Sequence, residues 1–141
     1  MREVDYDDPM QTIRKMEAEY GLTSKQMSAY MGMSWSSYRH YAYTKSSMLS
    51  LDTLFRLSGA SDLVCKLLVD GIVLKTKKDV NEMFCALTDG VPAGQRKQTF
   101  LSMGHCLQAY YYWRKSIKVD NLKRYCDKTG HLCQMYVGLK V

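Results

Sequence analysis

Residues 22–43 read LTSKQMSAYMGMSWSSYRHYAY, and this stretch decides the fold of the N-terminal part of the chain. Thr23 and Gln26 have the spacing of a capping box, which opens a helix by satisfying two backbone N–H groups. Gly32 predicts the end of that helix, because glycine enters the left-handed conformation without strain. Ser34 is a suitable N-cap for the next helix. The stretch therefore predicts two short helices joined by a tight turn.

The flanking residues predict two further helices. Pro9, preceded by the possible caps Asp7 and Asp8, favours a helix start, and Gly21 favours its end. On the other side, a helix over residues 35–43 is followed by a loop rich in Ser and Thr, after which Ser50 opens a fourth helix. Two short consecutive helices inside such a group of four are typical of a helix-turn-helix.

The rest of the chain predicts short helices and two strands. The expected elements are a helix over 63–69, a strand over 72–74, a helix opened by a capping box of Asp79 and Glu82, a long helix through Phe100 and Ile117, a helix from Asp120 to Gly130, and a terminal strand over 131–141.

Residues 22–43 resemble, without a gap, the Cro/repressor (XRE-type) helix-turn-helix family. Thr23 stands at the family's N-cap, Met27 at its buried leucine, Gly32 at its turn glycine and Tyr38 at the buried aliphatic position of its recognition helix. Residues 50–54, Ser-Leu-Asp-Thr-Leu, resemble the opening of its fourth helix, and the resemblance covers about residues 9–60. The sequence departs from the family at Ser28, where alanine is usual, and at residues 42–44, where the family has Glu-Asn-Gly.

The resemblance implies that residues 1–62 form a lambda-repressor-like, DNA-binding helix-turn-helix bundle. It does not extend to residues 63–141, where the residue pattern predicts a small helical domain with minor β structure that serves dimerisation or partner binding. The fold class predicted for the chain is therefore mainly α, with two domains. The positions that the resemblance assigns to DNA contact are Ser24, Trp35, Ser36, Arg39, His40, Tyr43 and Lys45.

Trp35 is the largest departure from the family, because its position usually carries a polar residue that contacts a base. It could stack or pack against a thymine methyl group, or it could be an aromatic residue that faces a protein partner or a second copy. Arg39 can donate two hydrogen bonds to guanine O6 and N7, and Ser36 can bond to either kind of base edge.

The charge distribution also favours nucleic acid. The chain has a net charge of +6, yet residues 20–51 and 90–119 contain no carboxylate. A surface without carboxylates does not repel polyphosphate. A generic basic surface is the alternative interpretation.

The C-terminal half has one concentrated cluster of aromatic and basic residues, Tyr112, Trp113, Arg114 and Lys115. Such a cluster suits single strands, duplex backbones or protein partners equally. Packing in the core, with a solvated rim, is the alternative. We assign these four residues as candidate partner-binding residues.

The function predicted from the sequence is a transcriptional regulator, a repressor or autorepressor of a bacterium, phage or mobile element. It would act as a homodimer on double-stranded operator DNA. The alternative is an anti-CRISPR-type inhibitor, whose helix-turn-helix represses its own operon and whose C-terminal half binds a Cas nuclease. An antitoxin is a third possibility.

The remaining predictions are absences. No catalytic motif appears, so we expect no enzyme and no cofactor. The spacings of His105, Cys106, Cys126, His131 and Cys133 match no standard zinc site, so we expect no metal. No long apolar run or signal-peptide pattern is present, and the five cysteines form no C-x-x-C pair, which favours the cytoplasm and excludes a membrane partner.

Overall fold

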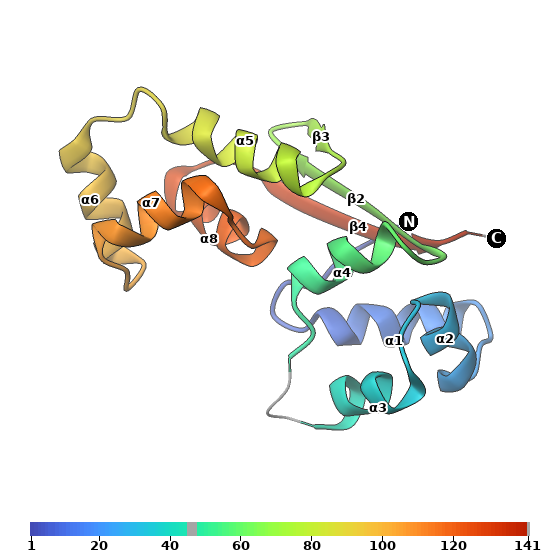
Figure 1. The fold of residues 1–141 in the computed structure, drawn as a ribbon. Coiled ribbons are helices and arrows are strands. Elements are labelled where there is room, and N and C mark those ends of the chain that lie inside the picture. Colours follow the sequence, from blue (N-terminus) through green and yellow to red (C-terminus); the bar gives the residue numbers. More distant parts are fainter. Residues whose placement is uncertain (45–47, 141) are drawn as a thin grey trace. The chain divides into compact units, whose positions relative to one another are not determined.

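The computed structural model describes residues 1–44 and 48–140 of the chain (Figure 1). These residues form eight helices and a small four-stranded antiparallel sheet, and 56% of them lie in helices. The expectation of a mainly helical chain with minor β structure is confirmed. The chain divides into two compact units: the first is Met1–Lys66 with Met135–Val141, and the second is Leu67–Gln134.

The sheet has the strand order β1-β4-β2-β3. Its strands are β1 (Arg2–Glu3), β2 (Leu63–Val69), β3 (Ile72–Leu74) and β4 (Cys133–Leu139). In the first unit β1 pairs with β4, with Arg2 opposite Val137, and the Val4 N–H donates to the Met135 carbonyl at 2.9 Å. In the second unit β2 and β3 form a hairpin. Its turn, Asp70-Gly71, has positive φ values of 49° and 82°, a conformation that suits these two residue types.

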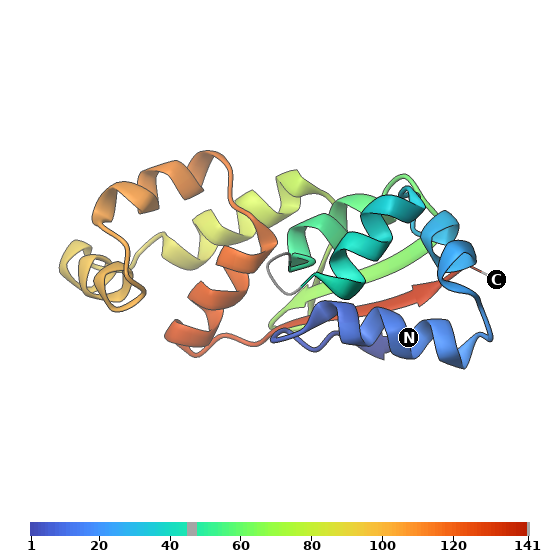
Figure 2. The ribbon, with the colours of Figure 1, turned by 90° about the horizontal axis from the view of Figure 1, so that it is seen from below.

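Four helices form the rest of the first unit: α1 (Pro9–Glu19), α2 (Ser24–Tyr30), α3 (Trp35–Tyr43) and α4 (Leu51–Ser58) (Figures 1 and 2). The predicted N-caps are confirmed. The side chains of Asp8, Thr23, Ser34 and Ser50 each accept a backbone N–H three residues later. Thr23 and Gln26 form the full capping box. Local chemistry therefore fixes where each helix begins.

The turn between α2 and α3 depends on Gly32. This residue has φ +68°, and a Cβ added there would lie 2.9 Å from the Cβ of Ser61. The Asp62 N–H donates to the Tyr30 carbonyl at 3.0 Å, so the segment after α4 is held against the end of α2. Both the left-handed backbone and the close approach require glycine at position 32.

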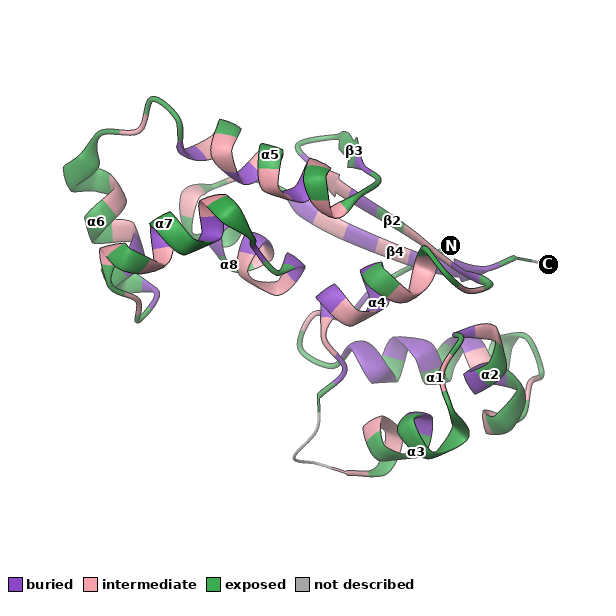
Figure 3. Ribbon diagram, in the orientation of Figure 1, coloured by how far each residue is buried: buried purple, intermediate pink, exposed green. Residues whose placement is uncertain are grey.

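The core of the first unit is aliphatic and rich in methionine. Its fully buried side chains include Ile13 and Met16 on α1, Met27 on α2, Met31 just after α2, Tyr38 on α3 and Leu54 on α4, together with Leu49, Leu63 and Val137 outside these helices. Figure 3 shows α3 as mostly exposed, and Tyr38 is its one buried residue. A helix attached through one buried side chain leaves most of its surface available to a partner.

The second unit contains α5 (Lys77–Thr88), α6 (Ala93–Ser102), α7 (Leu107–Lys115) and α8 (Val119–Thr129). Its core is an aromatic cluster. Phe84 on α5 is fully buried, and four ring centroids lie 5.2–6.4 Å from its own, those of Phe100, Tyr110, Trp113 and Tyr125. These separations are typical of edge-to-face aromatic packing.

Several predicted elements of the second half are wrong. Residues 63–69 form strand β2 and not a helix, because Leu63, Leu67 and Val69 are buried on one face and the Asp70-Gly71 turn pairs the segment with β3. The expected long helix is divided into α6 and α7, since Gly104 has φ +80° and interrupts it.

The expected helix starts also need correction. Helix α5 begins two residues before Asp79, because Thr76 is the N-cap and Asp79, not Glu82, completes the capping box. Helix α8 begins at Val119 after Lys118, so Asp120 lies inside its first turn, where its charge suits the helix dipole. The predicted strands over 72–74 and in the C-terminal tail are confirmed as β3 and β4.

The two units do not follow the expected division at residue 62. The chain passes from the first unit to the second after Lys66, inside β2, and returns at Met135, inside β4. Residues 135–141 therefore group with the N-terminal helices, because β1 pairs with β4.

Candidate nucleic-acid interface

The outer face of α3 carries four of the predicted contact residues. Ser36, Arg39, His40 and Tyr43 are exposed, and their spacing places them on one side of the helix. Together with Thr44 they line an open hollow of about 380 Å³. The structure therefore brings these four predicted residues together on one surface.

Trp35 lies at the start of α3, and its side chain is 46% exposed. The guanidinium carbon of Arg39 lies 4.9 Å from the centre of the indole ring, and the Lys25 ammonium nitrogen lies 6.0 Å from it. Both distances are in the range of cation–π attraction. Arg39 belongs to the same helix as Trp35 and Lys25 belongs to α2, so the indole ring contacts one cation from α2 and one from α3.

A half-buried acid, Glu17, anchors the inner side of α3. The Tyr38 hydroxyl donates a hydrogen bond to Glu17 of α1, and the Ser24 hydroxyl of α2 donates to the same carboxylate at 3.0 Å. Burial, followed by the hydrogen bond with Glu17, raises the pKa of Tyr38 well above its ordinary value. One carboxylate therefore joins three helices. Because the Ser24 proton is used inside the unit, Ser24 does not belong to the exposed set.

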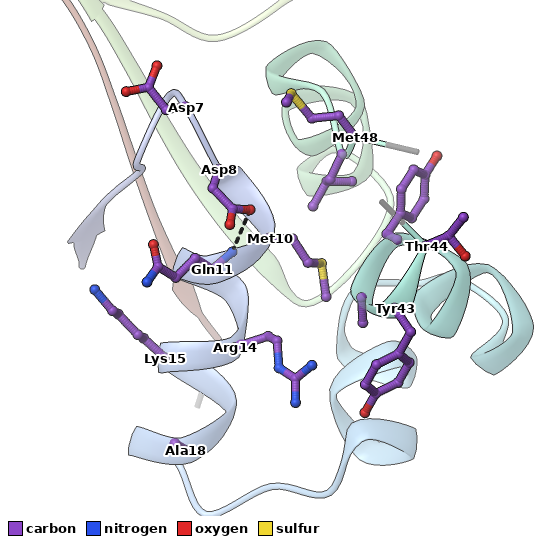
Figure 4. Close-up of a pocket in the computed structure, with 13 residues that line it drawn as sticks. Asp7, Asp8, Met10, Gln11, Arg14, Lys15, Ala18, Tyr43, Thr44 and Met48 are labelled. Carbon is purple, nitrogen blue, oxygen red and sulfur yellow. Dashed lines mark hydrogen bonds between the residues drawn. The ribbon is translucent and has the colours of Figure 1, made fainter. Parts of the chain in front are cut away.

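A larger pocket of about 860 Å³ lies beside the C-terminal end of α3 (Figure 4). Its wall includes Tyr43, whose ring centre lies 5.1 Å from the Arg14 guanidinium carbon of α1. The lining contains acidic residues, Asp7 and Asp8, and basic residues, Arg14 and Lys15. Lys45, a predicted contact residue, lies outside the described residues.

The predicted partner cluster does not remain together on the surface. Tyr112 is 65% exposed and Lys115 is exposed, whereas Trp113 is buried in the aromatic core with 7% exposure. Arg114 donates to Asp89 at 2.9 Å and to the Tyr110 hydroxyl at 2.8 Å, and these bonds hold its pKa above the ordinary value, with Asp89 contributing most. Trp113 therefore belongs to the core of the second unit, and Arg114 is held by contacts within that unit at its surface.

No family model, no curated protein and no solved structure matches the chain. Within residues 1–44 and 48–140, no three His, Cys, Asp or Glu residues are grouped so that they could hold a metal ion. The helices of this part of the chain are too short or too polar to cross a membrane.

The sequence did not reveal three residues that contact the side chains of α3. Lys25 and Arg14 contact the aromatic rings of Trp35 and Tyr43, and Glu17 binds Tyr38 and Ser24. Lys25 and Arg14 are separated in sequence from the rings they contact, and only the packing of α1 and α2 against α3 brings them near. The i, i+4 spacing of Trp35 and Arg39 was the available signal for their contact.

Proposed function

We propose that the chain is a sequence-specific DNA-binding regulator of the helix-turn-helix type, acting in the cytoplasm of a bacterium or on behalf of a phage or mobile element. The observation that carries the proposal is the face of α3, where Ser36, Arg39, His40 and Tyr43 are exposed together. The sequence from residue 20 to 51 supplies no carboxylate that would repel phosphates or compete for Arg39.

In this proposal α3 lies in the major groove, which is wide enough to admit a helix. Arg39 donates to guanine, Ser36 and His40 reach neighbouring base edges, and Tyr43 lies toward the sugar-phosphate backbone. Lys25 on α2 adds positive charge beside the start of α3. The turn at Gly32 sets the angle between α2 and α3, and so the direction in which α3 faces the DNA.

Replacing Arg39 by alanine tests the proposal. We expect it to weaken binding to the chain's own promoter by roughly 1–3 kcal/mol and to relax the sequence preference at one position. Lys25→Ala should instead weaken all duplexes alike and lower the slope of log K against log salt by about one unit. Fluorescence anisotropy on promoter and scrambled duplexes measures both effects.

The exposed Lys66 provides the matched control, since Lys66→Ala removes a positive charge of the same unit from a strand and not from α3. It should leave promoter affinity within about twofold, as expected for a surface change. Wild-type protein that binds promoter and scrambled duplexes with equal affinity would contradict the proposal.

A single helix-turn-helix reads one half-site, so a homodimer on a near-palindromic operator is part of the proposal. Strand β3 supports it, because β3 is an edge strand of the sheet and carries exposed Ile72 (57%) and Val73 (42%). An exposed apolar edge strand is suited to pairing with a second copy.

Ile72→Lys is therefore expected to shift the mass in solution from dimer to monomer at tens of micromolar. The charged side chain would have to be desolvated in a paired edge. Light scattering gives the mass, and Lys75→Ala, at an exposed position just after β3, is the control. A wild-type monomer at this concentration would count against dimeric operator binding.

The second unit favours one further candidate function, that of an inhibitor with a protein partner such as a Cas nuclease. The outward face of α7 shows Gln108, Tyr111, Tyr112 and Lys115, all exposed at helical spacing. Exposed tyrosines beside a lysine resemble the centre of a protein interface. DNA binding is the preferred function because the surface at α3 brings two cations, Arg39 and Lys25, to one exposed ring, whereas the α7 face carries the single cation Lys115.

A further inference from the structure

The contact between Trp35 and Arg39 has a role of its own at the start of α3. We propose that Trp35 is a positioning residue that holds the Arg39 guanidinium ready to read a guanine, and that Trp35 itself does not read a base. This inference rests on the proposed DNA-binding function and names the base that the site recognises. Its basis is the 4.9 Å approach of the guanidinium carbon to the ring centre, one helical turn apart on an exposed face.

A stacked guanidinium is well suited to base reading. Arginine lying over an aromatic ring keeps its in-plane N–H donors available, because the ring contacts only the flat face of the group. A free arginine side chain loses up to about 2 kcal/mol of rotamer entropy when it is fixed. Contact with Trp35 restricts those rotamers before DNA arrives, so less freedom is lost on binding.

The base that matches two adjacent N–H donors of a guanidinium is guanine. In the major groove guanine presents two adjacent acceptors, O6 and N7, and the other bases do not. Within the described residues, Arg39 forms no ion pair that would hold its donors elsewhere. Residues 20–51 also contain no carboxylate that could compete with a DNA base for these donors.

Lys25 has a different role on the same ring. Its ammonium group lies 6.0 Å from the ring centre and comes from α2, so it contributes charge beside the groove-facing helix without the planar fork that guanine requires. We therefore expect Lys25 to act on phosphates and Arg39 on the base. Removing the N7 acceptor of a guanine should therefore affect the contact of Arg39 and leave that of Lys25 unchanged.

The test uses full-length protein and a duplex enriched from a randomised pool by the wild-type chain. Each guanine of the enriched duplex is replaced in turn by 7-deazaguanine, which lacks the N7 acceptor but keeps normal base pairing. Wild-type protein should lose about tenfold in affinity at one position. Arg39→Ala should bind the normal duplex more weakly and show no loss at that position.

The Trp35 variants then distinguish positioning from folding. Trp35→Ala should reduce the 7-deazaguanine effect at that position to less than threefold, whereas Trp35→Phe should keep most of it because a ring remains under Arg39. Lys25→Ala should lower affinity for every duplex and leave the tenfold effect intact. A loss of folding alone would weaken normal and substituted duplexes equally, and thermal unfolding of each variant measures it.

Two failures are separable. If the wild-type chain enriches no sequence from the pool, the DNA-binding function itself is refuted, and this inference with it. If it enriches a sequence but no guanine shows the N7 effect, guanine reading by Arg39 is refuted together with the positioning role of Trp35, and DNA binding by the chain stands. If Trp35→Ala keeps the full tenfold effect, only the positioning role of Trp35 is refuted.

Discussion

Phe84→Ala is expected to lower the free energy of unfolding of the second unit by about 3–5 kcal/mol. Phe84 is fully buried, and its ring packs against Phe100, Tyr110, Trp113 and Tyr125. Removing the ring leaves a cavity that four large, stiff aromatic neighbours cannot fill by small shifts. Natural domains have about 5–15 kcal/mol of stability in total, so this single change removes a large share of it.

The two tryptophans of the chain make the measurement direct. Trp35 belongs to the first unit and Trp113 to the second, so a Trp35→Phe background leaves Trp113 as the reporter of the second unit. In a urea titration followed by Trp113 fluorescence, Phe84→Ala should unfold at a lower midpoint concentration of urea than the protein without this change. Tyr112→Ala on the exposed side of α7 is the matched control and should change stability by less than about 0.5 kcal/mol. Equal effects of the two changes would refute the central place of Phe84 in this core.

Gly32→Ala is expected to destabilise the first unit by about 2–4 kcal/mol and to weaken the proposed DNA binding as well. The left-handed conformation at φ +68° costs an alanine about 1–2 kcal/mol. A new Cβ would also lie 2.9 Å from the Ser61 Cβ, so the backbone has to move. Because α3 begins three residues later, that movement would change the angle at which Arg39 is presented.

Gly21 offers a nearly ideal control, since it has φ +66° but no atom within 4 Å of an added Cβ. Gly21→Ala measures the backbone strain alone, by urea unfolding, and the excess at Gly32 measures the close approach. Ser61→Gly alone removes the hydrogen bonds of the Ser61 hydroxyl with the Leu57 carbonyl and the Leu63 N–H, so it serves as the reference background. In that background Gly32→Ala should cost less than in the wild-type chain, because the two Cβ atoms then no longer meet. If Gly21→Ala and Gly32→Ala cost the same, the contact with Ser61 has no energetic role.

The predictions from sequence succeeded where the signal was local. The caps at Asp8, Thr23, Ser34 and Ser50 act on backbone groups three residues away, so the sequence contains both partners of each interaction. They failed at residues 63–69, where a run of Leu and Val fits a helix or a strand equally and pairing with β3 and β4 decides. Gly104 was overlooked because apolar spacing continues across it.

The candidate site shows the same division. The exposed face of α3 follows from helical spacing, so Ser36, Arg39, His40 and Tyr43 could be grouped in advance. The burial of Trp113 could not, because at the end of α7 the sequence contains three tyrosines and a tryptophan that could each have filled the core. Packing of α5 and α6 against α7 selects Tyr110 and Trp113.

The pairing of β1 with β4 has a consequence for the order of events during protein synthesis. Arg2 lies opposite Val137, and the Val4 N–H bonds to the Met135 carbonyl, so each of these residues is synthesised long before the β4 residue that it contacts. Helices α1 to α4 can begin to form as they emerge, but their sheet cannot close until residues 133–139 arrive. Closing so long a loop is slow, because ordering entropy is lost before the contacts form. Strand β1 therefore lacks this partner until β4 has been synthesised.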